Sequence, residues 1–267
     1  MWKYLELIYM NLKMSLMKQM FYKANFIMRL VADTAYLVIY YIFFELLFDQ
    51  IPVINSWQKE EVFVIMGTFH MINSLFLGVF FSNVVQIPHL IKTGKFDDYL
   101  LMPVKIKFIM STVNMDISSL INFIFGLNIV IISIHSLNIN TSLFVIFRYI
   151  LFVLLGTYTH YNIFFLIMIS AFWIGDSTWG ISFFMKFNSF ADKPISLFRG
   201  AISRLITFII PIGLVANTPA SILLDKGQES LSLVMVIISI LIFIVTRYFL
   251  SRGLRYYESS GTNILGG

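Results

Sequence analysis

Six long apolar stretches, spread along the whole chain, most constrain what this sequence can fold into. A helix that crosses a bilayer needs about 20 predominantly apolar residues. Hydrophobic residues make up 58% of the chain and charged residues only 12%, with a mean hydropathy of +0.84, whereas a soluble domain is typically about 25% charged. The core of a soluble protein could bury one such helix but not all of them, so the medium around the protein must itself be apolar. The predicted spans are 24–48, 62–85, 106–134, 142–167, 195–215 and 231–250.

The predicted fold class is all-α, a polytopic membrane protein with six transmembrane helices. Backbone that faces lipid must satisfy its own hydrogen bonds, and the apolar runs do not alternate as barrel strands would. The spans use most of the 267 residues, which leaves no room for a separate soluble domain. We therefore expect an interface helix at 1–23, a membrane domain at 24–250 and a cytoplasmic tail at 251–267. The chain has no cysteine, so it forms neither disulfides nor thiolate metal sites.

The basic residues predict the orientation of the spans. With the N-terminus placed in the cytoplasm, 16 of the 19 Lys and Arg residues fall on that side, and only Lys59, Arg148 and Lys226 fall on the other. Cytoplasmic loops carry such an excess of Lys and Arg. Both termini are therefore expected inside and residues 49–61, 135–141 and 216–229 outside. The net charge of +5 follows from this distribution, and no nucleic-acid partner is expected.

Residues 1–23 have the pattern of an amphipathic helix lying on the membrane surface. Lysines at 3, 13, 18 and 23 could reach anionic head groups of the membrane lipid. The alternative is a plain cytoplasmic extension of the first span. The apolar residues at helical spacing are Trp2, Leu5, Tyr9, Leu12, Leu16 and Met20.

The first span carries Arg29, Asp33 and Glu45, and the charged residues singled out within the membrane are Arg29, Asp33 and Asp116. Such a group costs at least about 2.5–3.5 kcal/mol to insert, so it must face protein or water. Arg29 and Asp33 are four residues apart and share a helix face, which predicts a buried ion pair. Asp116 is expected nearer the middle of the membrane. A structural ion pair and a substrate path or relay both remain open for these residues.

The fifth hydrophobic region is interrupted by Pro211, Gly213 and Pro219, with Asn217 between the prolines. A straight span does not suit this run. It predicts a helix followed by a re-entrant or kinked segment before the last span, provided that neighbouring protein satisfies the freed backbone groups.

The loop at 86–105 is the longest cytoplasmic connection with a pattern of its own. Pro88 can open a short helix and Gly94 can end it, which predicts a helix near 88–93. The apolar residues Leu90, Ile91, Phe96 and Leu100 exceed what a solvated loop needs, so something is expected to pack against them. An ordinary connecting loop is the alternative.

Motifs for catalysis and metal binding are missing from the sequence. It contains no H-E-x-x-H zinc motif, Gly94-Lys95 lacks the earlier glycine of a P-loop, and 175–180 departs from a nucleophile elbow. The four histidines lie on different predicted elements. No catalytic residue and no metal site is therefore expected.

Together these features resemble an ABC-2 type transporter permease, specifically the branch of about 260 residues. Later features of the branch are also present: 191–195 before the fifth span, Ile210-Pro211 followed by 218–220, and the closing 253–261. The branch's loop pattern I-x-x-G-x-[LF]-D-x-x-L-L-x-P is matched at Ile91, Gly94, Phe96, Asp97, Leu100, Leu101 and Pro103.

The resemblance implies a permease subunit of an ATP-driven exporter in a bacterial plasma membrane, without catalysis of its own. Two permease subunits, identical or similar, would pair over two ATPase subunits, which bind the ATP and Mg. This chain would bind no cofactor. The resemblance places the re-entrant segment at Pro211, Asn217 and Pro219. The residues it implies for contact with the ATPase are Pro88, Leu90, Ile91, Gly94, Phe96, Asp97 and Leu100.

Two other functions compete with this reading. A secondary transporter would use Asp33, Asp116 or Glu45 as a proton relay, and pH-driven transport by the chain alone would identify it. A lipid-modifying membrane enzyme would turn over lipid in detergent.

Overall fold

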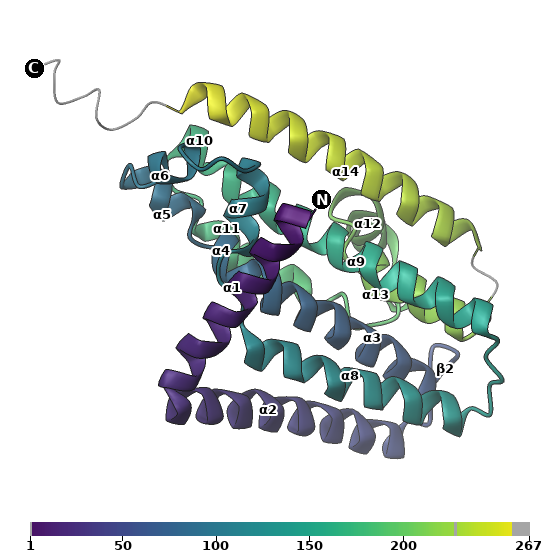
Figure 1. Ribbon diagram of the computed structural model, residues 1–267. Helices are drawn as coiled ribbons and strands as arrows, with labels where there is room; N and C mark the ends of the chain where they lie inside the picture. Colours follow the sequence, from purple (N-terminus) through teal and green to yellow (C-terminus); the bar gives the residue numbers. More distant parts are fainter. Residues whose placement is uncertain (1, 227–228, 258–267) are drawn as a thin grey trace, which may run out of the picture.

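The computed structural model describes residues 2–226 and 229–257, which form helices and one short hairpin (Figure 1). The first half comprises α1 (Trp2–Phe21), α2 (Lys23–Gln50), β1 (Val53–Ile54), β2 (Trp57–Gln58), α3 (Lys59–Phe76), η1 (Leu77–Phe81), α4 (Ser82–Val84), α5 (Ile87–Lys92), α6 (Asp97–Leu100), α7 (Ile106–Thr112) and α8 (Ile117–Ser136). The second half comprises α9 (Leu143–Ile169), α10 (Ala171–Ile174), α11 (Trp179–Asn188), η2 (Ile195–Leu197), α12 (Gly200–Arg204), η3 (Leu205–Ile209), α13 (Ile212–Leu223) and α14 (Glu229–Tyr256).

The prediction of an all-α polytopic membrane protein is confirmed. Five helical segments of the described chain are long and apolar enough to span a membrane, and a further helix pair, bent by 84°, is a broken span or a re-entrant loop. The five segments are Lys23–Gln50, Lys59–Lys92, Ile117–Ser136, Leu143–Ile174 and Glu229–Tyr256. The bent pair, Gly200–Ile209 with Ile212–Leu223, confirms that the fifth hydrophobic region is broken.

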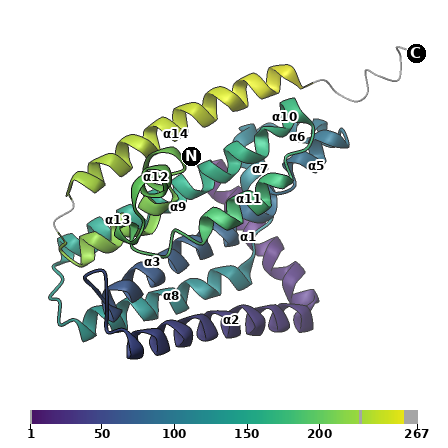
Figure 2. The same ribbon diagram turned by 180° about the vertical axis from the view of Figure 1, so that it is seen from behind.

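The bundle has two distinct ends (Figures 1 and 2). Helices α5, α6, α7 and α10 gather at one end, which we name the loop end. The antiparallel hairpin β1–β2 lies at the opposite end, which we name the hairpin end. The last helix runs past the expected boundary at Leu250 to Tyr256 at the loop end. Residues 227–228 and the tail residues 258–267 lie outside the described residues.

The third span begins later than the sequence predicts. The chain breaks at 113–116, so the apolar run at 106–134 becomes the short α7 and the spanning α8. Asp116 is the N-cap of α8, which corrects its expected place near the middle of a span. Asn83 stabilises the break, because its amide donates to the carbonyls of Ser111 at 3.1 Å and Asn114 at 2.7 Å. A side chain from another helix thus replaces part of the missing helical hydrogen bonding.

The fifth passage between the two ends also differs from the prediction. The chain leaves the loop end near Asp176, which shares a groove with Lys92. It reaches the hairpin end at Ser196, whose carbonyl and hydroxyl accept hydrogen bonds from Asn55 and Trp57 at 2.9 and 2.7 Å. This passage consists of the ten-residue α11 and an irregular segment, not of 195–215. The segment 175–194, expected as a cytoplasmic loop, therefore traverses the bundle.

This correction changes the sorting of the basic residues. Arg199 and Arg204 come after the arrival at the hairpin end, although the sequence count placed them with the cytoplasmic group. The charge bias is consequently smaller than predicted. The basic residues of α1, of the 86–105 loop and of the end of α14 still share the loop end.

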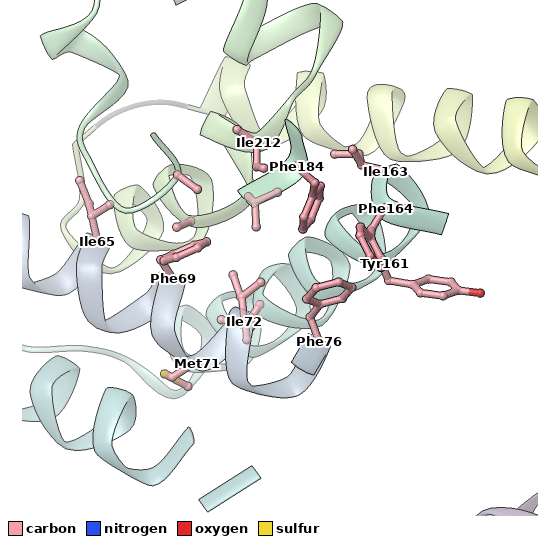
Figure 3. Close-up of a cluster of buried hydrophobic side chains, with 14 of the residues drawn as sticks. Ile65, Phe69, Met71, Ile72, Phe76, Tyr161, Ile163, Phe164, Phe184 and Ile212 are labelled. Atoms are coloured by element: carbon pink, nitrogen blue, oxygen red, sulfur yellow. The ribbon is translucent and has the colours of Figure 1, made fainter. Parts of the chain in front are cut away.

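The core lies where α3, α9, α11 and α13 meet (Figure 3). Phe69, Ile72 and Phe76 of α3 face Phe164 of α9 and Phe184 of α11. The rings of Phe76 and Phe164 cross edge to face at 5.5 Å, a favoured geometry for aromatic pairs. On its other side α3 packs against α8 through two facing glycines, Gly67 and Gly126.

Candidate functional site

The 86–105 loop contains the short helix that the sequence predicts. Pro88 occupies the first turn of α5, where a missing N–H is tolerated. Gly94 has φ +72°, the left-handed conformation that ends a helix at little steric cost. Because the span Lys59–Lys92 includes α5, this helix extends the second transmembrane helix.

Phe96 anchors the loop to the bundle and is 0% exposed. Its ring meets Phe172 at 5.3 Å and Tyr257 at 5.1 Å. Burial and the neighbouring Asp97 carboxylate raise the pKa of Tyr257 to about 12. The loop therefore packs against both α10 and the residue that follows α14.

From the sequence, the apolar side chains of this loop are expected to contact another protein. In the structure most of them pack against this chain's own core instead. Pro88 and Phe96 are buried, and Leu90 and Ile91 are partly buried against the core. Only Leu100 of the predicted apolar contacts is exposed, at 46%. Replacing Phe96 with a charged residue would therefore damage the fold, because its side chain is fully buried.

An exposed apolar patch follows instead at Leu100, Leu101 and Met102, with Leu101 84% exposed. We name these three residues the loop patch. Lys92 and Lys95 are exposed on the same loop. Beside it, a groove of about 680 Å³ runs between the loop and the end of α14, lined in part by Lys92, Trp173 and Arg255. This end of the molecule offers both apolar and basic contacts.

Helix α1 holds the loop end from the side. Lys3 donates from Nζ to the carbonyl of Pro103 at 2.8 Å. Further along α1, Asn11 donates to the carbonyl of Thr112 at 3.0 Å, the Ser15 hydroxyl accepts from the N–H of Met115 at 2.9 Å, and Gln19 donates to the Met115 carbonyl at 2.8 Å. These polar residues face the break before α8.

The apolar residues of α1 point away from the protein. Trp2, Leu5 and Tyr9 are 80%, 56% and 66% exposed. A helix with its polar face on the bundle and its apolar face outward suits a lipid interface. The interface helix itself stays a prediction.

The predicted intramembrane charges are brought together differently from the expectation. Arg29 places Nη2 2.5 Å from the Asp116 carboxylate, whereas Asp33 is 3.9 Å from Arg29 Nε. The Arg29 and Asp33 side chains are 58% and 40% exposed, so the pair is not buried as expected. The closer bridge connects α2 with α8, which favours a structural role for Arg29 and Asp116.

Asp116 is held by hydrogen bonds as well as by this charge. Its Oδ1 accepts from the N–H of Ser118 at 3.2 Å and from the Ser118 hydroxyl at 2.6 Å, and its Oδ2 accepts from the Ser119 hydroxyl at 3.0 Å. An N-cap carboxylate satisfies donors at the start of a helix. A proton relay needs a carboxylate that changes partners, and this one is committed to its helix.

Sequence reasoning missed Asp192, which lies in the segment expected to be cytoplasmic. In the structure Asp192 is buried and accepts a short hydrogen bond from the Tyr40 hydroxyl of α2. It also contacts Lys193 at 2.8 Å. The sequence gives little indication of this role. With the fifth span predicted at 195–215, Asp192 and Lys193 fall in a loop, where adjacent opposite charges are expected to be solvated.

The bent pair before the last helix is stabilised by Asn217. Its amide donates to the carbonyls of Lys193 at 2.9 Å and Gly213 at 3.0 Å, and its oxygen accepts from the N–H of Ile195 at 3.0 Å. Asn217 therefore ties α13 to the irregular end of the fifth passage. Pro211 is the N-cap of α13.

Pro219 lies inside α13, where a proline removes one backbone donor. The carbonyl that it frees is that of Val215, four residues earlier. A Cβ on Gly156 of α9 would lie 2.7 Å from this oxygen. The glycine lets α9 approach α13 closely. Pro211, Asn217 and Pro219 therefore each contribute to the structure of the bend.

The fold and this site define a polytopic helical membrane protein whose second span extends into a patterned loop at one end. The chain belongs to the ABC-2 family of transporter proteins, whose model matches residues 34–261. It is thus the membrane permease component of an ABC transporter, a transport subunit and not itself an enzyme. No significant match is found among curated proteins or among solved structures.

Proposed function

We propose that this chain forms half of the translocation pathway of an ATP-driven exporter and that the 86–105 loop docks on a separate ATPase subunit. The observation that carries this proposal is the combination of a buried anchor, Phe96, with an exposed apolar patch at Leu100–Met102 on the same loop. Large exposed apolar patches mark interaction sites, and we assign this one to a protein partner because it lies on the loop that follows the second span. ATP and Mg bind to that partner.

The loop is built to pass on a displacement. It is tied to α10 and α14 through Phe96 and to α1 through Lys3 and Pro103. A flexible loop would absorb the movement of a closing ATPase pair. A loop packed in this way transmits it to the second span instead.

A second permease subunit, of the same or a similar sequence, completes the pathway. Arg29, Asp33 and Tyr36 form an exposed polar stripe on α2, which spans the bundle. Lipid does not accommodate such a stripe, so protein or a water-filled path must cover it. In this arrangement both termini lie in the cytoplasm of a bacterial cell, with the loop end facing the ATPase.

The test is a purification of the tagged chain from its native membranes, with vanadate-sensitive ATP hydrolysis as the readout. Leu101→Asp should remove the co-purifying ATPase activity while leaving the unfolding temperature unchanged, because Leu101 is 84% exposed. The matched control is Ile51→Asp at the hairpin end, where Ile51 is 52% exposed. If Leu101→Asp retains its ATPase and hydrolysis, the docking assignment is wrong.

A further inference from the structure

A cavity of about 420 Å³ lies along α2, away from the 86–105 loop. Helix α2 contributes Asp33, Tyr36 and Tyr40, and Phe69 of α3 and Asp192 after α11 lie across from them. Ligand sites of drug-sized molecules occupy about 300–1,000 Å³, so the volume suits a small amphiphile.

The two cations that line the cavity are already held by close carboxylate partners. Arg29 lies 2.5 Å from Asp116. Lys193 lies 2.8 Å from Asp192 and donates to the carbonyl of Ser189 at 2.6 Å. Neither cation is left to hold an anionic ligand.

Asp33 is the carboxylate with the weakest compensation. Its nearest cationic atom is Nε of Arg29 at 3.9 Å, and its side chain is 40% exposed. Arg29 is shared with Asp116, which lies much closer. Three carboxylates, Asp33, Asp116 and Asp192, thus share the two cations Arg29 and Lys193, and Asp33 has the most distant cationic partner.

Aromatic and apolar groups stand beside this charge. The rings of Tyr36 and Tyr40 stack with centroids 6.2 Å apart and planes 12° apart. Tyrosine faces attract cations within about 6 Å of the ring. Leu37, Phe69 and Met185 supply apolar wall.

We propose that this cavity binds organic cations with an apolar body, the charge resting on Asp33 and the body against the stacked tyrosines. Such cations would be the substrate class of the transporter, an assignment that rests on the proposed function. The ammonium of a free amphiphile and that of a lipid head group share this chemistry.

The test is equilibrium dialysis of tetraphenylphosphonium against the purified chain in dodecyl maltoside, without any ATPase. We expect saturable binding that Asp33→Asn weakens about tenfold, since the Coulombic attraction between the carboxylate and the cation is lost. Asp33→Glu should retain most of the affinity. Asp49→Asn is the matched control, because Asp49 is exposed on the same helix and does not line the cavity.

Competing compounds show whether the cavity recognises charge or shape, and whether its natural occupant is a lipid head group. Tetraphenylborate has a similar shape and the opposite charge, so it should not displace the probe. Phosphatidylethanolamine should displace it if the head-group ammonium is the natural occupant, and phosphatidylglycerol should not.

Equal binding by Asp33→Asn, or equal displacement by tetraphenylborate or phosphatidylglycerol, would overturn the proposal. The unfolding temperature reports whether each variant folds. Tyr36→Ala gives a second test, because Tyr36 is 66% exposed and its removal should weaken binding several-fold without loss of fold. Since no ATPase is present, a failure here is distinct from a failure of the docking proposal.

Discussion

The closest approach of α3 and α8 makes Gly126→Ala a direct test of the packing described above. A Cβ on Gly126 would lie 2.8 Å from the carbonyl oxygen of Gly67 and 3.0 Å from the backbone nitrogen of Met71. Both neighbours are backbone atoms of one helix, so neither can turn away as a side chain would. The two helices must therefore move apart to accept the methyl group.

The expected loss of stability is a difference between two effects. Overpacking a well-packed interface costs about 1–3 kcal/mol, and a gap of about 0.5–1 Å forfeits a quarter to a half of the local van der Waals attraction. Alanine returns about 0.5–1 kcal/mol through its better helix propensity. We therefore expect a net loss of about 1–2 kcal/mol, which corresponds to a fall in Tm of roughly 2–8 °C at this size.

The assay is thermal unfolding of the purified chain in detergent, followed by size-exclusion recovery. Ile131→Val is the matched control, because Ile131 lies on α8 with 57% exposure and should change little. The double variant with Gly67→Ala should lose less than the sum of the single losses, because one separation relieves both contacts. An unchanged or higher Tm for Gly126→Ala would refute the close approach of these backbones.

Three further predictions concern charge and topology. Asp116→Ala should destabilise the chain more than Asp116→Asn, by about 1 kcal/mol, because asparagine also caps a helix; thermal unfolding of the two variants tests this, and equal losses would argue against the N-cap role. Burial lowers the pKa of Lys107 to about 8, so the unfolded state binds more protons between that pH and the ordinary lysine value, and stability should rise with pH across this window. The Tm of the wild type minus that of Lys107→Met should therefore increase from pH 7.5 to pH 10, and a constant difference would contradict the shift. Cysteines introduced at Asn55 and at Arg199 should both label from outside intact cells, whereas labelling of Arg199→Cys only after permeabilisation would restore the topology read from the sequence.

Much of the fold can be predicted from the sequence because the membrane spans are long runs of apolar residues. Runs of about 20 apolar residues identify membrane helices whatever their partners are, and prolines at 211 and 219 mark the broken region. The break at 113–116 was missed because its stabilising partners, Asn83 and the polar face of α1, come from distant parts of the chain. Hydropathy averages across such a break.

The site was predictable in its position and less so in its contacts. Pro88 and Gly94 bound the short helix in sequence and in structure, because their backbone preferences are local. Whether Phe96 points outward or inward depends on Phe172 and Tyr257, which no local pattern reveals. The bridge from Arg29 to Asp116 was missed for the same reason: spacing within one helix favours Asp33, and only the packing of α2 on α8 brings Asp116 closer.

The long helical segment from Lys59 to Lys92 connects the loop end with the hairpin end, so it can carry a movement from one end to the other. Its 34 residues correspond to about 50 Å at 1.5 Å per residue, so a small tilt imposed at α5 sweeps a larger arc at the hairpin end. The π-helical turn η1 interrupts this segment at Leu77–Phe81, and such turns often mark functional positions in helices. There the Gly78 carbonyl accepts the Asp116 N–H at 2.7 Å. A displacement that enters at α5 passes the turn at 85–86 and then reaches this π-helical turn, beside the bridge between Arg29 and Asp116. Leu77 of the turn also lines the cavity along α2.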